Sequence, residues 1–240
     1  WADFDRLART LAEKFETSQG EGHAILAEQV PSPSLRLVRK HLAENFPKAA
    51  WHTYEPVDTS EALKGAEIAF GQKLVAKPNF AALDRVLALD CDFLGCDPDA
   101  VANGRAFGTR RKVEKPADTM NRLYVVESTY TVTGVMADHR LRLPAAQIGG
   151  LLVAVARKLK AAHAAKLMNA AAIPDNLPDT GSAYSDRWVE AVANDLASHQ
   201  FRSAVVVGPR QPAWVHALAH GVNAALFAHG PITSVFPVRM

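Results

Sequence analysis

The sequence predicts an α/β fold in which mostly parallel strands are flanked by helices. The first observation is that short apolar stretches alternate along the chain with amphipathic stretches of helical spacing. Strands that alternate with helices pair in parallel through crossover connections. The second observation is the composition, because 48% of the 240 residues are hydrophobic and 22% are charged, as in ordinary globular proteins. This balance excludes an intrinsically disordered chain.

Charge, hydropathy and cysteine content exclude several classes of protein. The net charge of +2 gives no reason to expect a nucleic-acid partner. No run of about 18 apolar residues is present, so we expect no membrane span in this chain. Two cysteines, Cys91 and Cys96, are too few for a disulfide framework or a four-cysteine cluster. The chain begins at Trp1 without a signal peptide, and we expect it to be a fragment of a longer protein.

Two helices and one strand are predicted at the start of the chain. The first helix has one apolar face and is followed by glycines that should end it, as shown by Phe4, Leu7, Ala8, Leu11, Phe15, Gly20 and Gly22. Residues 23–29 predict a buried strand. Ser32 and Pro33 then have the pattern of an N-cap followed by proline at the first helical position.

The same alternation continues toward the middle of the chain. Residues 50–54 predict a strand, and Asp58 with Glu61 resembles a capping box that opens a helix reaching about Phe70. Further strands are predicted at residues 85–92 and 123–127. Asp97 and Pro98 mark the start of a short helix between them.

Longer helices are predicted in the second half, with strands at residues 203–208 and 232–235. The apolar stripes of three helices are Ile148, Leu151, Leu152, Val155 and Leu159; Trp188, Val189, Val192 and Leu196; and Val215, Leu218, Ala219, Val222 and Leu226. Residues 172–185 are rich in Pro, Gly, Asn and Asp and indicate a loop. We therefore expect a Rossmann-like lobe over residues 1–171. Residues 172–240 should continue it as loop, helix, strand and helix, packed on the same lobe or forming a second small one.

Polar residues and one glycine follow three predicted strands at their carboxyl ends, where parallel sheets bind ligands. These candidate site residues are Asp92, Glu127, Ser128, Thr129, Gly208, Arg210 and Gln211. Arg210 and Gln211 precede a helix N-terminus, which favours anions, so they contact a ligand or cap that helix. Gly208 permits a close backbone approach to a ligand or simply a turn. No GxGxxG, GxxxxGK[ST] or GxSxG motif occurs, so nothing indicates a dinucleotide site, a P-loop or a nucleophile elbow.

Four other features are interpreted as structural. His216 and His220 are one helical turn apart, but Ala217 replaces the glutamate of HExxH, so a polar helix flank is favoured over a metal pair. Cys91 is predicted to be a small core residue. The basic run at residues 110–112 is interpreted as a solvated loop rather than a phosphate or acidic-partner site. A metal site built from Asp90, Asp92, Asp97 and Asp99 is disfavoured, since Asp97 is expected to cap a helix.

Several segments together resemble a known family. They are residues 69–71 (AFG), 87–95 (LALDCDFLG), 120–143 (MNRLYVVESTYTVTGVMADHRLRL) and 208–230 (GPRQPAWVHALAHGVNAALFAHG). This set resembles the molybdopterin-oxidoreductase family over most of the chain from about Ser32 onward. The likeness is closest to its divergent branch, the large iron–sulfur subunit of alternative complex III, a bacterial membrane quinol oxidoreductase.

Two departures from the catalytic members of that family matter for the cofactor. Glu127, Ser128 and Thr129 stand where catalytic members have an Asp-Pro-Arg type sequence. Residues 143–147 replace a Pro-Gly-Thr-Asp type turn whose acidic residue helps to hold the guanine of the pterin cofactor. The resemblance therefore implies a domain without molybdopterin that is not catalytic by itself. Its iron–sulfur clusters are expected in a C-terminal ferredoxin-like part outside this chain.

The resemblance also implies partners and a location. The partners are the cluster-bearing domain of the same chain, integral-membrane quinol-oxidising subunits and a cytochrome. The location is the periplasmic side of the bacterial inner membrane, as a peripheral domain. Two alternatives stay open, namely a fragment of an active molybdenum bis-pterin oxidoreductase similar to polysulfide reductase, and an unrelated α/β module that binds a small ligand.

Overall fold

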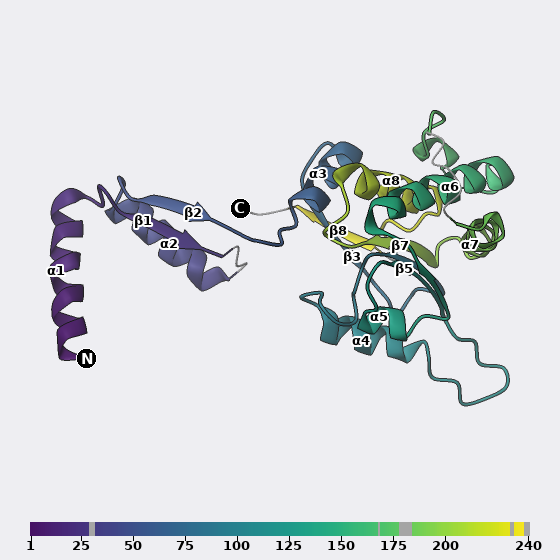
Figure 1. The fold of residues 1–240 in the computed structure, drawn as a ribbon, viewed down its shortest axis with the longest axis horizontal. Helices are drawn as coiled ribbons and strands as arrows, with labels where there is room; N and C mark the ends of the chain where they lie inside the picture. The colour runs from purple at the N-terminus through teal and green to yellow at the C-terminus, as the bar shows by residue number, and fades with distance from the viewer. Residues whose placement is uncertain (29–31, 168, 178–183, 231–232, 238–240) are drawn as a thin grey trace. The chain divides into compact units, whose positions relative to one another are not determined.

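A computed structural model describes residues 1–28, 32–167, 169–177, 184–230 and 233–237. The chain divides into two compact units, unit 1 from Trp1 to Val57 and unit 2 from Asp58 to Met240 (Figure 1). The sequence left open whether residues 172–240 pack on the same lobe as residues 1–171 or form a second one, and the two compact units meet after residue 57. Segments on both sides of residue 171 contribute strands to one sheet of unit 2.

Unit 1 contains two helices and a two-stranded parallel sheet, with the bounds α1 Ala2–Ser18, β1 Ala24–Ala27, α2 Pro33–Asn45 and β2 Ala50–Thr53. The predicted N-cap is confirmed, because Ser32 Oγ accepts a hydrogen bond from the Leu35 N–H at 3.4 Å. The predicted end of α1 is confirmed within two residues, since Gln19 and Gly20 both have positive φ, at 52° and 83°.

Burial in unit 1 differs from the sequence prediction. The strand expected at residues 23–29 is shorter, and its residues alternate between exposed and half-buried; residue 29 lies outside the described residues. No residue of α1 is buried, although its apolar face was predicted correctly, and Phe4 and Leu7 are 62% and 58% exposed. Helical periodicity shows which face is apolar but not whether another element covers it.

A four-stranded parallel sheet organises the described residues of unit 2, in the order β6-β5-β4-β7. Its strands are β4 Arg85–Leu89, β5 Arg122–Glu127, β6 His139–Arg142 and β7 Ser203–Val207. All neighbouring pairs are parallel, which confirms the predicted fold class. β4 ends three residues earlier than expected, because Asp90 adopts a left-handed φ of 50° that breaks the extended backbone.

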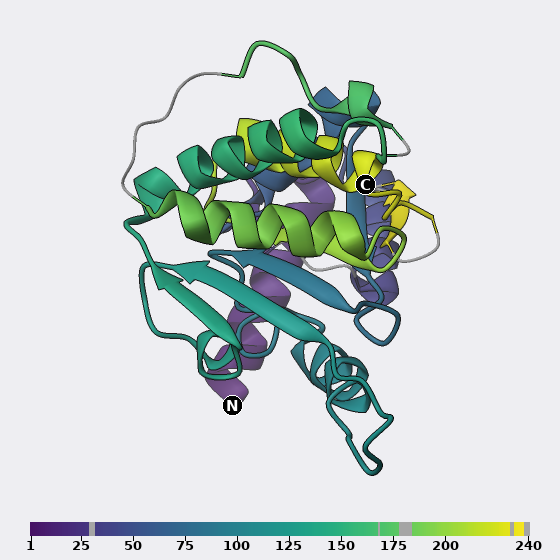
Figure 2. The same ribbon diagram turned by 90° about the vertical axis from the view of Figure 1, so that its right-hand side faces the viewer.

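Helices cover both faces of this sheet. They are α3 Ser60–Phe70, α4 Ala100–Thr109, α5 Val132–Val135, α6 Ala145–His163, α7 Asp186–Ser198 and α8 Ala213–Ala225, with a short 3-10 helix, η1, at Ala170–Ala172. Figures 1 and 2 show α6, α7 and α8 on one face of the sheet and α4 on the other. The periodic helices α6, α7 and α8 are confirmed. The short elements α5 and β6 were not predicted, because four residues are too few to show a period.

Two hydrophobic clusters fill the two faces. Leu87, Leu89, Tyr124 and Val126 face α6, α7 and α8 in the larger cluster. Alternate residues of the same strands face a smaller cluster that includes Phe80, Phe93 and Phe107. This alternation follows from the period of two in a strand. The central strands are therefore buried on both sides, as in parallel sheets generally.

A second, antiparallel pair of strands lies in unit 2, formed by β3 Leu74–Pro78 and β8 Thr233–Pro237. β3 was not predicted, and residue 232 of the predicted last strand lies outside the described residues. The predicted capping box is wrong. Asp58 accepts from the Ser60 N–H at 3.0 Å, but the Glu61 carboxylate reaches another helix instead of closing the box. Among the described residues, no helix is both long and apolar enough to span a bilayer.

Candidate functional site

The strand order of unit 2 places one topological switch point in the sheet. The chain passes from β4 to β5 on one side, whereas β7 lies on the other side of β4. Ligands of open parallel sheets bind outside the carboxyl ends of the strands at such a point. The predicted site residues lie after β4, β5 and β7, so the carboxyl edge of this sheet is the candidate site.

Gly208 brings the ends of β4 and β7 together. Its N–H donates to the Leu89 carbonyl at 2.9 Å. A Cβ at Gly208 would lie 1.7 Å from the Asp90 carbonyl oxygen. Glycine is therefore required because the backbone of Asp90 occupies the space where a side chain would be. The close approach predicted for Gly208 is real, but its partner is the neighbouring strand end of this chain.

Arg210 and Gln211 both contact Asp90. Gln211 is 2% exposed, and its side-chain amide donates to the Ala145 carbonyl at 3.3 Å and to the Asp90 carboxylate at 3.4 Å. The Arg210 guanidinium lies 3.5 Å from the same carboxylate and is mostly exposed. These two residues, the best predicted ligand contacts, thus bridge the ends of β4 and β7 and the start of α6.

Asp92 is held by the loop that follows β5. Its Oδ1 accepts from the N–H and the hydroxyl of Thr133 at 2.9 and 2.8 Å. Burial alone would raise the pKa of Asp92, but hydrogen bonds from Thr133, Cys96 and Thr131 hold it below its ordinary value. The hydrogen bond to Asp92 in turn raises the pKa of the Cys96 thiol. A carboxylate satisfied in this way is a structural acceptor and a poor proton donor.

Glu127 is also satisfied internally. It is 2% exposed, and its two carboxylate oxygens meet Arg140 Nε and the Thr131 hydroxyl, both at 2.6 Å. The Arg140 guanidinium also lies 4.4 Å from the centroid of the Tyr130 ring. The loop after β5 therefore folds back over the end of its own strand. Ser128 and Thr129, predicted as site residues, are exposed and are not brought to the other candidates by any described hydrogen bond.

Glu61 caps the helix that Arg210 and Gln211 were expected to cap. Its Oε2 accepts from the Ala213 N–H, at the first residue of α8, at 2.9 Å. Hydrogen bonds from Lys64 and then from Ala213 lower the pKa of Glu61. A carboxylate at a helix N-terminus is favoured by the helix dipole. Sequence reasoning singled out Glu61 as a capping residue but assigned it to α3, because nothing local relates it to a helix 152 positions away.

The histidines of α8 have different surroundings from those expected, whereas Cys91 packs against the smaller hydrophobic cluster, as predicted. The rings of His220 and His229 lie beside Phe70, and burial lowers the pKa of His216, His220 and His229, that of His220 to about 4. The prediction of a polar helix flank is therefore wrong for His216, which is 6% exposed. Burial and three nearby aspartates raise the pKa of Cys91 to about 12. Among the described residues, no group of three or more His, Cys, Asp or Glu side chains is arranged to hold a metal ion.

The basic run at residues 110–112 is mostly tied into the fold. Arg110 pairs with Asp84, and Arg111 pairs with Asp138 at 2.7 Å while lying over the Phe107 ring. The expectation of a solvated loop is therefore wrong for both arginines, because their charges are neutralised by internal carboxylates. Lys112 is exposed and pairs with Glu114.

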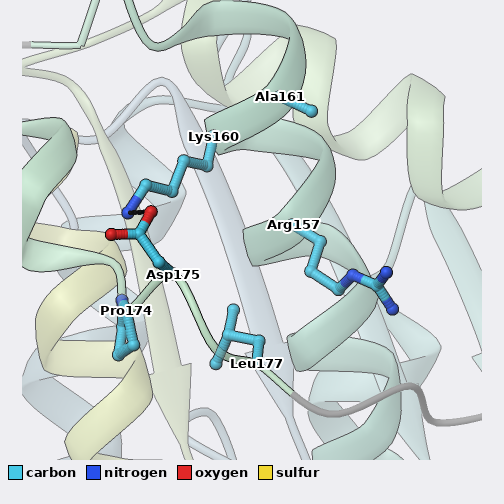
Figure 3. A pocket seen from close by; sticks show the side chains of 6 residues that line it. All are labelled: Arg157, Lys160, Ala161, Pro174, Asp175 and Leu177. Atoms are coloured by element: carbon cyan, nitrogen blue, oxygen red, sulfur yellow. Dashed lines mark ion pairs between the residues drawn. The ribbon is translucent and has the colours of Figure 1, made fainter.

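A hollow of about 270 Å³ opens beside the last turns of α6 (Figure 3). It is lined by Arg157, Lys160, Ala161, Pro174, Asp175 and Leu177. The Lys160 ammonium points to the loop after η1, where it donates to the Ile173 carbonyl and pairs with Asp175 at 2.6 Å. Lys160 thus anchors that loop. The hollow contains none of the residues predicted from the sequence.

Comparison with known proteins supports the fold. No family model matches the chain, and no curated protein matches it. A solved structure that it resembles is acetylene hydratase from Pelobacter acetylenicus, with 11% identity and a TM-score of 0.55. The alignment covers 94% of this chain and 32% of the other, so the chain spans about a third of that protein's length. The likeness to part of this structure confirms the expected α/β fold with a parallel sheet flanked by helices.

Proposed function

We propose that this chain is a non-catalytic scaffold domain of a membrane-associated iron–sulfur subunit that takes part in quinol-oxidising electron transfer. Similarity of its fold to part of a molybdopterin-family enzyme supports the general class. Fold alone does not carry a function. The proposal therefore depends on the groups found at the carboxyl edge of the sheet in unit 2.

The observation that carries the proposal is that the chain fills this edge with its own groups. The ends of β4 and β7 are joined by the Gly208 to Leu89 hydrogen bond, and Gln211 lies across them. Glu61 places a carboxylate on the first N–H of α8, where a phosphate would otherwise bind. A second anion there would be repelled by that carboxylate. The residues present do not fit a pterin cofactor with its phosphates, and we assign none to this domain.

The remaining parts of the proposal concern what lies outside this chain. Electrons would pass through iron–sulfur clusters in a cluster-bearing domain of the same protein. Integral-membrane subunits would oxidise quinol, and a cytochrome would accept the electrons. The domain would be peripheral, on the periplasmic side of the inner membrane, and would position the cluster-bearing part. The internal bonding of its carboxyl edge suits such a structural role.

The test is the metal and pterin content of the full-length protein, purified from its native membrane. We expect stoichiometric iron without molybdenum, tungsten or pterin. Stoichiometric pterin together with molybdenum or tungsten would overturn the proposal and favour the active molybdenum oxidoreductase. A preparation without iron would overturn the electron-transfer part of the proposal.

A further inference from the structure

Three histidines in unit 2 have buried ring nitrogens without partners. His216 and His220 lie on α8, and His229 follows that helix. Nε2 of His216, Nδ1 of His220 and Nε2 of His229 are buried and make no hydrogen bond with any described residue. Buried polar atoms are nearly always hydrogen-bonded, so three exceptions near one helix need an explanation.

The rings of two of these histidines pack around Phe70, the last residue of α3. The Phe70 centroid is 4.9 Å from that of His220 and 5.3 Å from that of His229. The two imidazole centroids are 5.8 Å apart. The cluster therefore joins α3, α8 and the segment after α8 through aromatic contacts.

The cluster lies at the base of the second sheet of unit 2. Phe70 leads into β3, and His229 leads into β8. These two strands pair antiparallel, with Leu74 opposite Pro237 and Pro78 opposite Thr233. The connection from His229 is short, because the Gly230 N–H donates to the Thr233 carbonyl at 3.0 Å. Separation of the two histidines would therefore loosen both strands where they leave the helices.

We propose that His220 and His229 form an acid-sensitive latch, which joins the segments that lead into β3 and β8 to α8 when both rings are neutral and releases them when the rings are protonated. The latch is a conformational device of this fold and does not depend on the proposed electron-transfer role. Two protonated rings at this spacing would repel each other in a setting where burial already opposes charge.

Among the described residues, no acidic side chain acts electrostatically on His220 or His229. On α3, the negative charge of Glu61 raises the pKa of His216. That carboxylate is already paired with Lys64 and accepts a hydrogen bond from the Ala213 N–H. β7 and η1 carry no titratable side chain. The basic side chains of α6 contact residues outside the cluster. Lys158 pairs with Glu190, and Lys160 pairs with Asp175. His163 contacts Asn194, and Arg157 lines the hollow beside α6. The electrostatic interactions of His220 are with His229 and His216, both of which lower its pKa.

The direction of the pH effect follows from the lowered pKa values. An unfolded histidine titrates near about 6.5, whereas burial and its histidine neighbours lower the pKa of His220 to about 4. The closed form binds fewer protons than the open form, so its stability is complete above pH 6.5 and decreases as the pH falls toward 4. For His220 alone, the opening equilibrium should rise about thirtyfold between pH 7.5 and pH 5.

The test is hydrogen exchange of backbone amides in the chain of residues 1–240, corrected for the intrinsic effect of pH. We expect the amides of residues 74–77 and 233–236 to lose protection about thirtyfold at pH 5, while β4 and β5 keep theirs. The double variant His220→Phe with His229→Phe keeps the aromatic packing and should remain protected at pH 5. His163→Gln changes a histidine of α6 outside the cluster. This variant should lose protection of the β3 and β8 amides at pH 5 to the same extent as the unchanged chain.

Three outcomes would overturn the latch. The first is equal loss of protection in β4 and β5, which would mean general acid unfolding. The second is an unchanged acid response in the double variant. The third is an ordinary titration of His220 and His229 in carbon-detected NMR of the unchanged chain, without any opening. This last measurement decides the matter even if the double variant does not fold.

Discussion

The two edges of the four-stranded sheet both carry charged residues but use them differently. At the amino ends, Asp84 pairs with Arg110 and Arg202, and Asp195 pairs with Arg85 and Arg122. At the carboxyl ends, Asp92 and Glu127 are satisfied mainly by hydroxyl groups, N–H groups and one arginine. Both edges are thus held by contacts between separate segments, but the amino edge uses mainly ion pairs, whereas the carboxyl edge uses mainly hydrogen bonds from hydroxyl, amide and backbone N–H groups. At both edges these four carboxylates have partners within the chain. The acidic residues of this sheet therefore stabilise the fold and are not available to bind a ligand.

The largest effect in this comparison is expected at the amino edge, for Asp195→Ala. The Asp195 side chain is 12% exposed and accepts from Arg85, Arg122 and Tyr124. Its removal leaves the half-buried guanidinium of Arg85 without a counter-ion, which should lower the free energy of unfolding by about 3–5 kcal/mol. Urea unfolding measures this. Asp175→Ala is the control, because Asp175 is 93% exposed in its pair with Lys160, and it should change stability by less than about 0.5 kcal/mol.

At the carboxyl edge, Gly208→Ala should have the next largest effect. The new Cβ would collide with the Asp90 carbonyl, which is backbone and can move only with β4. We expect a loss of about 2–3 kcal/mol by the same urea measurement. Gly108→Ala in α4 meets open space and should stabilise the protein by up to about 1 kcal/mol. A neutral Gly208→Ala would mean that the ends of β4 and β7 are not closed as described.

A smaller effect is expected for Thr133→Val, which keeps the side-chain volume but removes the hydroxyl. That hydroxyl donates to Asp92 and accepts from the Leu94 N–H at 3.0 Å. Loss of a hydrogen bond to a charged group should cost about 1.5 kcal/mol and raise the pKa of Asp92, which NMR of its carboxyl carbon can follow. Thr129→Val is the matched control at an exposed position and should leave both quantities unchanged. Equal effects of the two variants would contradict the role given to Thr133.

The smallest effect is expected for Arg210→Ala. The guanidinium is 59% exposed and lies 3.5 Å from Asp90, so its removal should cost less than about 0.5 kcal/mol. Thermal unfolding monitored by circular dichroism is sufficient to show this. A loss well above 1 kcal/mol would mean that Arg210 closes the carboxyl edge more strongly than Gln211 does.

The sequence was a good guide where a helix repeats its period or a strand is a nearly continuous apolar run. The helices α6, α7 and α8 and the strands β4, β5 and β7 follow from such local patterns. α5 and β6 do not, because four residues show no period. β3 is as long as β4, but Lys77 and Pro78 interrupt its apolar run. The exposure of the apolar face of α1 could not be predicted either, since an amphipathic pattern does not show whether another element covers that face.

For the candidate site, the sequence predicted which residues lie at the carboxyl ends of the strands but not which groups they contact. Parallel topology placed Asp92, Glu127, Gly208 and Gln211 at the carboxyl ends, and they do lie there. Their partners could not be predicted, because pairs such as Gln211 with Asp90 are separated by 121 positions. The capping of α8 by Glu61 was missed for the same reason. Only tertiary structure shows that these groups contact each other.

The most direct test of the central claim, that the chain fills its own carboxyl edge, is an NMR titration of residues 1–240 with guanosine diphosphate. This probe carries guanine and phosphates, the groups that the proposal says this edge does not bind. We expect no saturable change in the amide signals of Asp90, Gly208 and Ala213 up to millimolar concentrations. Saturable shifts confined to those residues would contradict the claim and would show that a ligand cleft is still functional at the switch point.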